Sequence, residues 1–390
     1  MRMLIAGGGT GGHLFPGLAL AEEVKTRHPR NDVLFVGTPR GLETRIVPKN
    51  GFRLELIEVA PLKRQGALGT LRGFLRLPRS VWQSQRILRK FDPDVVVGVG
   101  GYASGPVVIT AWFMRIPTAV QEQNALPGAT NRALAHFARA CFIAFEEARG
   151  SFPPSRTYLL GNPIRRAFLD NYLHSKEPSG ERLSVLVTGG SQGAHVLNLR
   201  VAEAVELLAP ALGARLRIVH QTGEKDFPEI AKRYEALRGS GIQVEATSFI
   251  DDMASAYAQA DLLVCRAGAT TIAELTVCKK PAILVPFPHA ADDHQTVNAR
   301  SLVRNGAAVL MPEKDLTGQK LADELRALEG DRERLRKMAR QSGLVGRPEA
   351  AREIAEVCVS LCARRLVREG RHLPAQQATK ALPPRGGGPG

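Results

Sequence analysis

Two short glycine-rich segments of this sequence have the composition of anion-binding loops. The first is Gly7-Gly8-Gly9-Thr10-Gly11-Gly12, and the second is Gly189-Gly190-Ser191-Gln192-Gly193. Each follows an apolar run typical of a strand, so the backbone N–H groups that open the next helix can face an anion. Glycine lets the anion approach the backbone closely. Both segments are therefore predicted to lie at a ligand site.

The first segment matches the Gly-x-Gly-x-x-Gly fingerprint of NAD-dependent enzymes. That fingerprint also requires an acidic residue at the end of the second strand, where it holds the ribose. Here the run Val33 to Val36 is followed by Gly-Thr-Pro-Arg, without a carboxylate. Hydride transfer is therefore disfavoured. The match still supports a loop whose backbone faces an anion.

His13 directly follows the first loop and precedes Pro16, which suits the first turn of a helix. An imidazole at this place has a pKa range suited to a general base. The alternative is a structural histidine that caps the loop.

The segment Arg266 to Glu274 contains small residues and two threonines at the start of a predicted helix. A helix N-terminus can neutralise a diphosphate, and the Glu274 carboxylate can accept hydrogen bonds from both ribose hydroxyls. Thr-x-x-Glu alone is also a capping box. The position of the segment after a predicted strand favours the nucleotide site.

Two segments with acidic or histidine residues have side chains that could ligate a metal. Asp92-Pro93-Asp94 precedes a predicted strand, which favours a helix-to-strand turn. The spacing of His289, Asp292, Asp293 and His294 fits no common metal site. No metal and no cofactor is expected.

Short β-branched runs alternate with helical patterns along the chain, which is typical of parallel sheets with crossover helices. The sequence predicts an α/β fold of two Rossmann-like, doubly wound parallel-sheet domains facing a central cleft. We expect an N-terminal domain over 1–163, a C-terminal domain over 164–345, a helix over 346–363 that crosses back to the first domain, and a basic Pro/Gly-rich tail over 364–390. The predicted strands are Met3–Ala6, Val33–Val36, Val95–Val99, Thr118–Gln121, Cys141–Ala144, Leu183–Thr188, Arg217–Gln221, Val244–Ala246, Leu262–Cys265, Ala282–Val285 and Ala308–Met311.

The net charge of +15 is concentrated in two places. Residues 61–91 contain eight basic side chains and no acidic one, interleaved with apolar residues, and the tail is also basic. This combination suits an anionic membrane surface; the alternative is a solvated helix face. Nucleic acid is disfavoured because aromatic residues are only 5% of the chain and no recognition motif occurs.

Neither a membrane span nor a disulfide framework is predicted. The most apolar stretch, residues 95–120, is interrupted by glycines, Pro106, Arg115 and Pro117. The N-terminal apolar run is too short for a signal peptide. The five cysteines form no CxxC pair, which favours buried thiols in a reducing compartment.

Eight motifs in order resemble the MurG family, the family 28 glycosyltransferases of peptidoglycan synthesis, as far as about Ala363. They are Gly8–His13, Gly100–Pro106, Glu122–Asn124, Gly161–Arg165, Gly189–Ala194, Phe249–Met253, Arg266–Glu274 and His294-Gln295. The resemblance implies the GT-B fold and an inverting, metal-independent transfer of N-acetylglucosamine from UDP-N-acetylglucosamine. The acceptor would be lipid I, the undecaprenyl-diphosphate-linked muramyl pentapeptide, at the cytoplasmic face of the inner membrane, where the protein would be peripheral.

The resemblance also implies roles for individual residues. His13 is the candidate base, with Glu122 behind it. The donor contacts would be Thr10, Gly11, Gly12, Asn124, Arg165, Ser191, Ile250, Ala269, Thr270, Thr271, Ile272, Ala273, Glu274 and Gln295. Tyr102 and Asn198 would lie on the acceptor side. The patch facing anionic lipids would comprise Arg72, Phe74, Leu75, Arg76, Leu77, Arg79 and Trp82.

One departure from the family pattern concerns the residue before Glu-Gln-Asn, which is often histidine in the family and is Gln121 here. Glutamine cannot act as a base, which leaves that role to His13.

Two alternative functions stay open. One is another GT-B reaction, such as nucleotide-sugar epimerisation or transfer to a diacylglycerol; the other is a non-catalytic, nucleotide-sugar-binding membrane protein.

Overall fold

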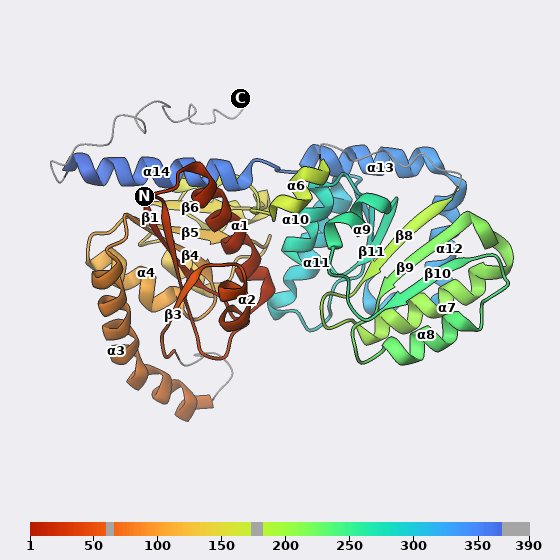
Figure 1. Cartoon of the computed structure of the whole chain (residues 1–390), viewed down its shortest axis with the longest axis horizontal. Helices are drawn as coiled ribbons and strands as arrows, with labels where there is room; N and C mark the ends of the chain where they lie inside the picture. Colours follow the sequence, from red (N-terminus) through yellow and green to blue (C-terminus); the bar gives the residue numbers. More distant parts are fainter. Residues whose placement is uncertain (60–65, 173–181, 369–390) are drawn as a thin grey trace. The chain divides into compact units, whose positions relative to one another are not determined.

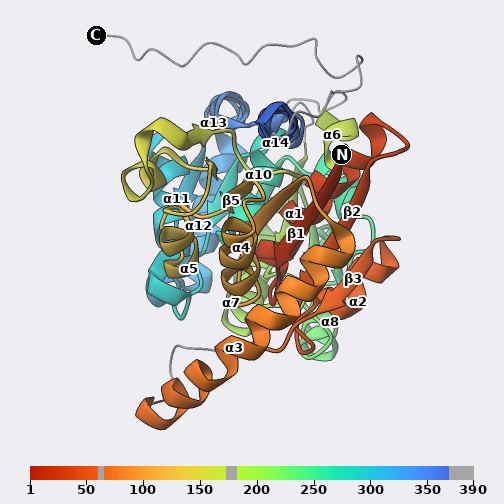
Figure 2. The ribbon, with the colours of Figure 1, turned by 90° about the vertical axis from the view of Figure 1, so that its left-hand side faces the viewer.

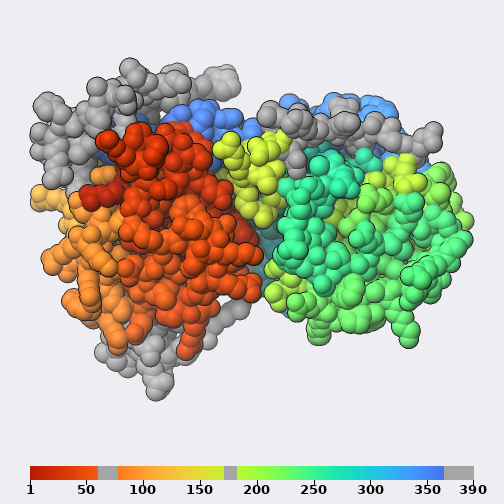
Figure 3. Space-filling model, in the orientation of Figure 1, coloured from red at the N-terminus to blue at the C-terminus, as the bar shows by residue number. Residues whose placement is uncertain are grey.

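The computed structural model describes residues 1–59, 66–172 and 182–368. Contacts divide these residues into two compact units. Unit 1 consists of residues 1–123 and 127–163 and the C-terminal segment from Glu349, and unit 2 consists of Asn124–Leu126 and Ile164–Pro348. In Figure 3 the visible surface of unit 1 is mainly red to orange, with the blue C-terminal segment above, and that of unit 2 is mainly green.

Unit 1 is built on a seven-stranded parallel sheet with the strand order β3-β2-β1-β4-β5-β6-β7. The strands are β1 (Arg2–Gly7), β2 (Asp32–Gly37), β3 (Arg53–Leu56), β4 (Val95–Gly100), β5 (Thr118–Glu122), β6 (Ala140–Ile143) and β7 (Thr157–Leu159). The helices are α1 (Gly11–Arg27), α2 (Glu43–Lys49), α3 (Gly66–Phe91), α4 (Ser104–Phe113), α5 (Ala129–Leu134) and α14 (Ala350–Arg368).

The sheet of unit 1 buries both of its faces because successive side chains of a strand point to opposite sides. Met3 and Ile5 of β1 pack in a core with residues of α1 and α14. Leu4 and Ala6 pack on the other face with residues of α3 and α4. The blue helix α14 is therefore part of unit 1, where it lies beside α1 (Figure 1).

Unit 2 has a six-stranded parallel sheet with the order β10-β9-β8-β11-β12-β13. Its strands are β8 (Leu183–Thr188), β9 (Leu216–Gln221), β10 (Gln243–Thr247), β11 (Leu262–Cys265), β12 (Ala282–Leu284) and β13 (Ala308–Leu310). Its helices are α6 (Arg166–Tyr172), α7 (His195–Leu212), α8 (Phe227–Glu235), α9 (Met253–Gln259), α10 (Ala269–Val277), α11 (His294–Arg304), α12 (Gly318–Gly330) and α13 (Arg332–Val345).

Both strand orders are those of the Rossmann fold, and the predicted α/β class is confirmed. In such sheets the order reverses next to the first strand, and ligands bind beyond the carboxyl ends of the two strands at that point. The reversal lies between β1 and β4 in unit 1 and between β8 and β11 in unit 2. These two edges are where a site is expected.

Helix α3 is the long amphipathic helix of the basic segment, and it packs on α4 (Figure 2). Over its described side chains, Ser80, Ser84, Ile87 and Leu88 are buried, whereas Arg79, Trp82, Arg86 and Arg89 are exposed. Among the helices that the structure describes, none has both the length and the apolar character needed to cross a bilayer.

Candidate functional site

The first glycine-rich loop lies at the reversal point of unit 1, where it crosses the loop that follows β4. Gly7 has φ +142° and Gly101 has φ +81°. A Cβ on Gly7 would lie 2.3 Å from the Gly100 carbonyl oxygen, and one on Gly101 would lie 2.5 Å from the Gly8 carbonyl oxygen. Glycine is thus required here both by backbone conformation and by the close approach of the two loops.

A buried carboxylate that the sequence did not single out, Glu43, occupies the inside of this first loop. Its oxygens accept hydrogen bonds from the Gly9 N–H at 2.7 Å and from the Thr38 N–H and hydroxyl at 2.8 and 3.0 Å. The side chain is 1% exposed. The Gly9 N–H therefore faces an anion that belongs to the protein itself, which argues against a diphosphate at the same donor.

His13 projects from the first turn of α1 toward the end of β5. Its Nδ1 lies 3.0 Å from Oε1 of Gln123, and its ring packs on Gly100, where a Cβ would come within 2.8 Å of it. Gln123 Nε2 donates to the carbonyl oxygens of Val99 and Gln121, which fixes its Oε1 toward His13. An amide oxygen can only accept, so Nδ1 carries the proton and Nε2 of the neutral imidazole carries the lone pair.

The expected position of Glu122 behind His13 is not observed, because the side chain that contacts the imidazole is that of Gln123. Side chains alternate between the faces of a sheet, so these neighbours point in opposite directions. Glu122 is 1% exposed and accepts hydrogen bonds from Gly128 N–H at 3.1 Å and Asn131 Nδ2 at 3.0 Å. Gln121, on the same side as Gln123, donates to Asn162 Oδ1.

The second glycine-rich loop lies at the reversal point of unit 2 and is held by Gln221, the last residue of β9. Gln221 Nε2 donates to Thr188 Oγ1 and to the Gly190 carbonyl, and its Oε1 accepts the Ile250 N–H at 2.9 Å. One buried side chain thus joins this loop to Ile250, which is one of the predicted donor contacts. Ser191 at the tip of the loop is exposed.

Helix α10 begins directly beyond β11 and presents a helix N-terminus at the same edge. Gly268 is its N-cap, and no side chain caps the helix. Thr270 and Thr271 therefore lie inside the first turn, so the segment is not a capping box. The Thr270 hydroxyl oxygen is buried and has no hydrogen-bond partner in the described structure.

Glu274 and Arg165, two of the predicted donor contacts, form an ion pair at the side of α10. Arg165 Nη2 lies 2.9 Å from Glu274 Oε1, and Glu274 is 6% exposed. Burial raises the pKa of the Glu274 carboxyl, and Arg165 partly opposes this rise. The guanidinium also stacks over the Phe168 ring, 4.9 Å from its centroid.

Asn198, predicted on the acceptor side, is 0% exposed. Its amide donates to the Thr222 carbonyl and to Asp226, and its oxygen lies 3.1 Å from His220 Nε2. Burial lowers the pKa of His220 to about 3, so this ring stays neutral. The network orders the turn after β9 and leaves Asn198 no surface with which to contact an acceptor.

The remaining predicted residues occupy varied places. Thr10 and Gly12 are exposed and Gly11 is half-buried in the first loop, and Tyr102 is 50% exposed. Gln295 of α11 is half-buried, and its Oε1 accepts the Phe287 N–H at 2.9 Å. In α3, Trp82 is 59% exposed beside Arg86, and Arg79 pairs with Glu58. The side chains of Arg72, Phe74, Leu75, Arg76 and Leu77 lie outside the described residues.

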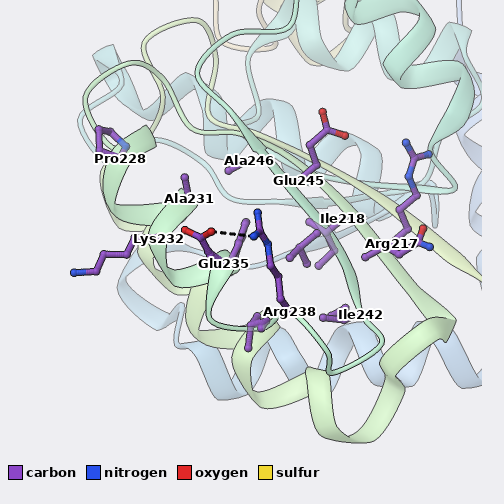
Figure 4. Close-up of a pocket in the computed structure, with 14 residues that line it drawn as sticks. Arg217, Ile218, Pro228, Ala231, Lys232, Glu235, Arg238, Ile242, Glu245 and Ala246 are labelled. Carbon is purple, nitrogen blue, oxygen red and sulfur yellow. Dashed lines mark ion pairs between the residues drawn. The ribbon is translucent and has the colours of Figure 1, made fainter.

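Unit 2 has two hollows on its described surface that differ in their relation to these residues. A cavity of about 380 Å³ between β8–β10 and α9 includes Ile250 and Phe249 in its wall. A groove of about 690 Å³ beside α8 and β10, with the Glu235–Arg238 ion pair, is shown in Figure 4 and contains no predicted site residue. The candidate site is therefore assigned to the strand ends and not to the larger groove.

Comparison with known proteins gives matches over nearly the whole chain. Residues 3–143 match the glycosyltransferase family 28 N-terminal domain, and residues 184–356 match the family 28 C-terminal domain. A Myxococcus xanthus protein named UDP-N-acetylglucosamine–N-acetylmuramyl-(pentapeptide) pyrophosphoryl-undecaprenol N-acetylglucosamine transferase is 57% identical over 383 residues, covering 98% of this chain and 99% of that protein. A protein of the same name from Anaeromyxobacter dehalogenans is 60% identical and covers 94% of each chain.

Among solved structures, the crystal structure of MurG from Acinetobacter baumannii superposes with a TM-score of 0.77. The two chains are 30% identical over 92% of this chain and 99% of that one. Fold and sequence thus point to the same group of proteins.

Proposed function

Because this chain belongs to glycosyltransferase family 28, we propose that it transfers N-acetylglucosamine from UDP-N-acetylglucosamine to the 4-hydroxyl of the N-acetylmuramyl unit of lipid I, forming lipid II in peptidoglycan synthesis. The observation that carries the proposal is the 57% identity over 98% of the chain to a protein named for this reaction. The geometry supports it in both units. In unit 1 the His13 imidazole can accept a proton at Nε2, and in unit 2 the N-terminus of α10 can bind an anion.

We assign the donor nucleotide to unit 2. The diphosphate lies at the N-terminus of α10, within the segment Ala269 to Ala273. The N–H groups of Ala269, Thr270 and Thr271 precede the first intrahelical bond, from Ile272 to Gly268, and the Thr270 hydroxyl gains the partner that it lacks. Arg165 adds a positive charge, and Ser191 contacts the nucleotide from the second loop. The Glu274 carboxylate holds the ribose.

The base of the nucleotide lies beside Ile250. Since the Ile250 N–H already donates to Gln221, the Ile250 carbonyl is the group left to pair with the N3–H of uracil. Asn124 and Gln295 contact the sugar. Preorganised donors around the diphosphate stabilise the charge that develops there without rearrangement at the moment of reaction.

We assign the acceptor to unit 1, with Tyr102 and His13, beside the first glycine loop, whose Thr10, Gly11 and Gly12 close on the donor. His13 Nε2 takes the proton of the 4-hydroxyl while the oxygen of that hydroxyl forms a bond to the anomeric carbon. The bond from that carbon to the diphosphate breaks on the opposite face, so the configuration inverts and UDP leaves. Gln123, through the hydrogen bond to Nδ1, keeps the lone pair on the nitrogen that faces the acceptor.

The direct test is transfer of radiolabelled N-acetylglucosamine from UDP-N-acetylglucosamine to a lipid I analogue by the purified protein. We expect a labelled disaccharide lipid. Labelled N-acetylmannosamine nucleotide would instead identify an epimerase. A labelled glycolipid formed in a parallel reaction, with diacylglycerol in place of the lipid I analogue, would identify a different acceptor. Donor binding without any product would identify a non-catalytic binding protein.

We propose further that the protein is peripheral at the cytoplasmic face of the inner membrane and that α3 faces anionic lipids. The acceptor is itself a membrane lipid. The exposed side of α3 combines Arg79, Arg86 and Arg89 with Trp82, and aromatic and basic residues together suit the headgroup region. Trp112 and Phe113, which end the neighbouring helix α4, are 44% and 72% exposed.

Charge reversal of Arg79, Arg86 and Arg89 to Glu is expected to abolish sedimentation with vesicles that contain anionic lipid. Each basic residue near such a surface contributes about 1 kcal/mol, so three losses weaken binding by more than about 100-fold. The control reverses three exposed lysines of unit 2, Lys225, Lys232 and Lys314. Equal loss in both variants, or persistent binding of the α3 variant, would place the contact elsewhere.

A further inference from the structure

One buried side chain of unit 2, Asn298 of α11, holds the segment Asn124–Leu126, which also belongs to unit 2 although it follows β5 in the chain. Asn298 is 0% exposed. Its Oδ1 accepts the Ala125 N–H at 2.8 Å, and its Nδ2 donates to Asn124 Oδ1 and to the Ala267 carbonyl, both at 3.2 Å. The acceptor and both amide hydrogens of Asn298 are therefore used.

The orientation of the Asn298 amide is fixed by backbone groups, whose polarity cannot change. The Ala125 N–H can only donate, so it must face the Asn298 oxygen. The Ala267 carbonyl can only accept, so it must face the Asn298 NH2 group. The NH2 group is therefore the end that meets Asn124, and Asn124 must turn its oxygen toward it. It follows that the Asn124 NH2 group points away from Asn298.

We propose that Asn298 is a positioning residue that makes Asn124 present a hydrogen-bond donor to the sugar of the nucleotide donor. This inference rests on the proposed function, in which Asn124 contacts N-acetylglucosamine. A donor at this place matches the carbonyl of the N-acetyl group, which can only accept, whereas a hydroxyl could bond to either end of the Asn124 amide. Because Ala267 precedes α10 directly, the same amide ties the sugar contact to the helix that receives the diphosphate.

The test replaces Asn298 by aspartate, which keeps the shape of the side chain and the acceptor for Ala125. The second carboxylate oxygen then faces Asn124, which is expected to reverse its amide and turn an oxygen toward the sugar, and the Ala267 carbonyl loses its donor. Affinities for UDP and for UDP-N-acetylglucosamine are measured by calorimetry. The loss of the Ala267 contact affects both ligands alike, so UDP-N-acetylglucosamine affinity should fall by about tenfold or more beyond any fall in UDP affinity, since a favourable hydrogen bond to the sugar becomes a repulsion.

The matched control is Asn305→Asp at the exposed end of the same helix, which should bind both ligands like the unchanged protein. A loss shared equally by UDP and UDP-N-acetylglucosamine would show that Asn298 only supports the fold and would overturn the proposal. So would unchanged binding of both ligands.

A second variant covers the case in which Asn298→Asp does not fold. Asn124→Asp keeps an oxygen for Asn298 and also turns an oxygen to the sugar, so it should show the same selective loss. Retained affinity for the sugar nucleotide in this variant would refute the inference. Failure of the unchanged protein to bind UDP-N-acetylglucosamine at all would instead contradict the proposed function.

Discussion

Replacement of His13 by alanine is expected to lower kcat by about 10²–10⁴-fold, the usual contribution of a general base. The affinity for UDP-N-acetylglucosamine should stay unchanged because His13 lies in unit 1 and the diphosphate contacts are assigned to unit 2. The structural basis is the hydrogen bond of Nδ1 with Gln123, which leaves the Nε2 lone pair for the acceptor hydroxyl. Steady-state transfer assays with donor titrations separate the two parameters.

The control for this variant is His136→Ala, an exposed histidine of the same unit. Its kcat should equal that of the unchanged protein. If His13→Ala retains full turnover, His13 is not the base. If it loses donor affinity in proportion to kcat, its role is structural support of the loop.

Replacement of Glu274 by alanine should weaken UDP binding by about 1.5–3 kcal/mol, the range for hydrogen bonds to a charged group. The buried carboxylate loses its bonds to the ribose, and Arg165 loses its ion-pair partner. Calorimetric titration with UDP measures the effect. Glu235→Ala, on the exposed side of α8, is the control and should leave the affinity unchanged.

The pH dependence of UDP binding gives an independent check of the Glu274 assignment. Burial raises the pKa of this carboxyl above its ordinary value of 4.5, and only the ionised form accepts hydrogen bonds from both ribose hydroxyls. UDP affinity of the unchanged protein should therefore begin to fall at a higher pH than an exposed glutamate would dictate. The Glu274→Ala variant should lack this fall in UDP affinity at low pH. If that variant binds UDP as tightly as the unchanged protein does, the assignment is refuted.

The fold could be predicted largely from local patterns. The central strands are buried on both faces, so they read as β-branched apolar runs, and every strand predicted from such a run exists. The two strands that were missed, β3 and β7, lie at the edges of the sheet of unit 1. β3 reads Arg-Leu-Glu-Leu and β7 reads Thr-Tyr-Leu, both with partly exposed side chains, so neither carries the apolar run of a buried strand.

The support of the site could not be predicted in the same way because it consists of contacts between distant residues. Glu43 and Gly9 are 34 positions apart, His13 and Gln123 are 110 apart, and Asn298 and Asn124 are 174 apart. The NAD fingerprint expects an acidic residue directly after β2, and the sequence has none there. A carboxylate does reach the first glycine-rich loop, but it belongs to Glu43 in the first turn of α2. A single sequence gives no distance between such residues.

The place of α14 in unit 1 has a consequence for the order in which the chain acquires structure during synthesis. Unit 2 is an almost continuous run from Ile164 to Pro348, whereas unit 1 needs Ile354, Cys358 and Leu361 from α14 to complete the core cluster that contains Met3 and Ile5. A ribosome therefore releases a complete unit 2 before unit 1 can close its core. Chains that terminate near Pro348 would carry an uncovered apolar face on unit 1, and such a surface is recognised by chaperones and proteases.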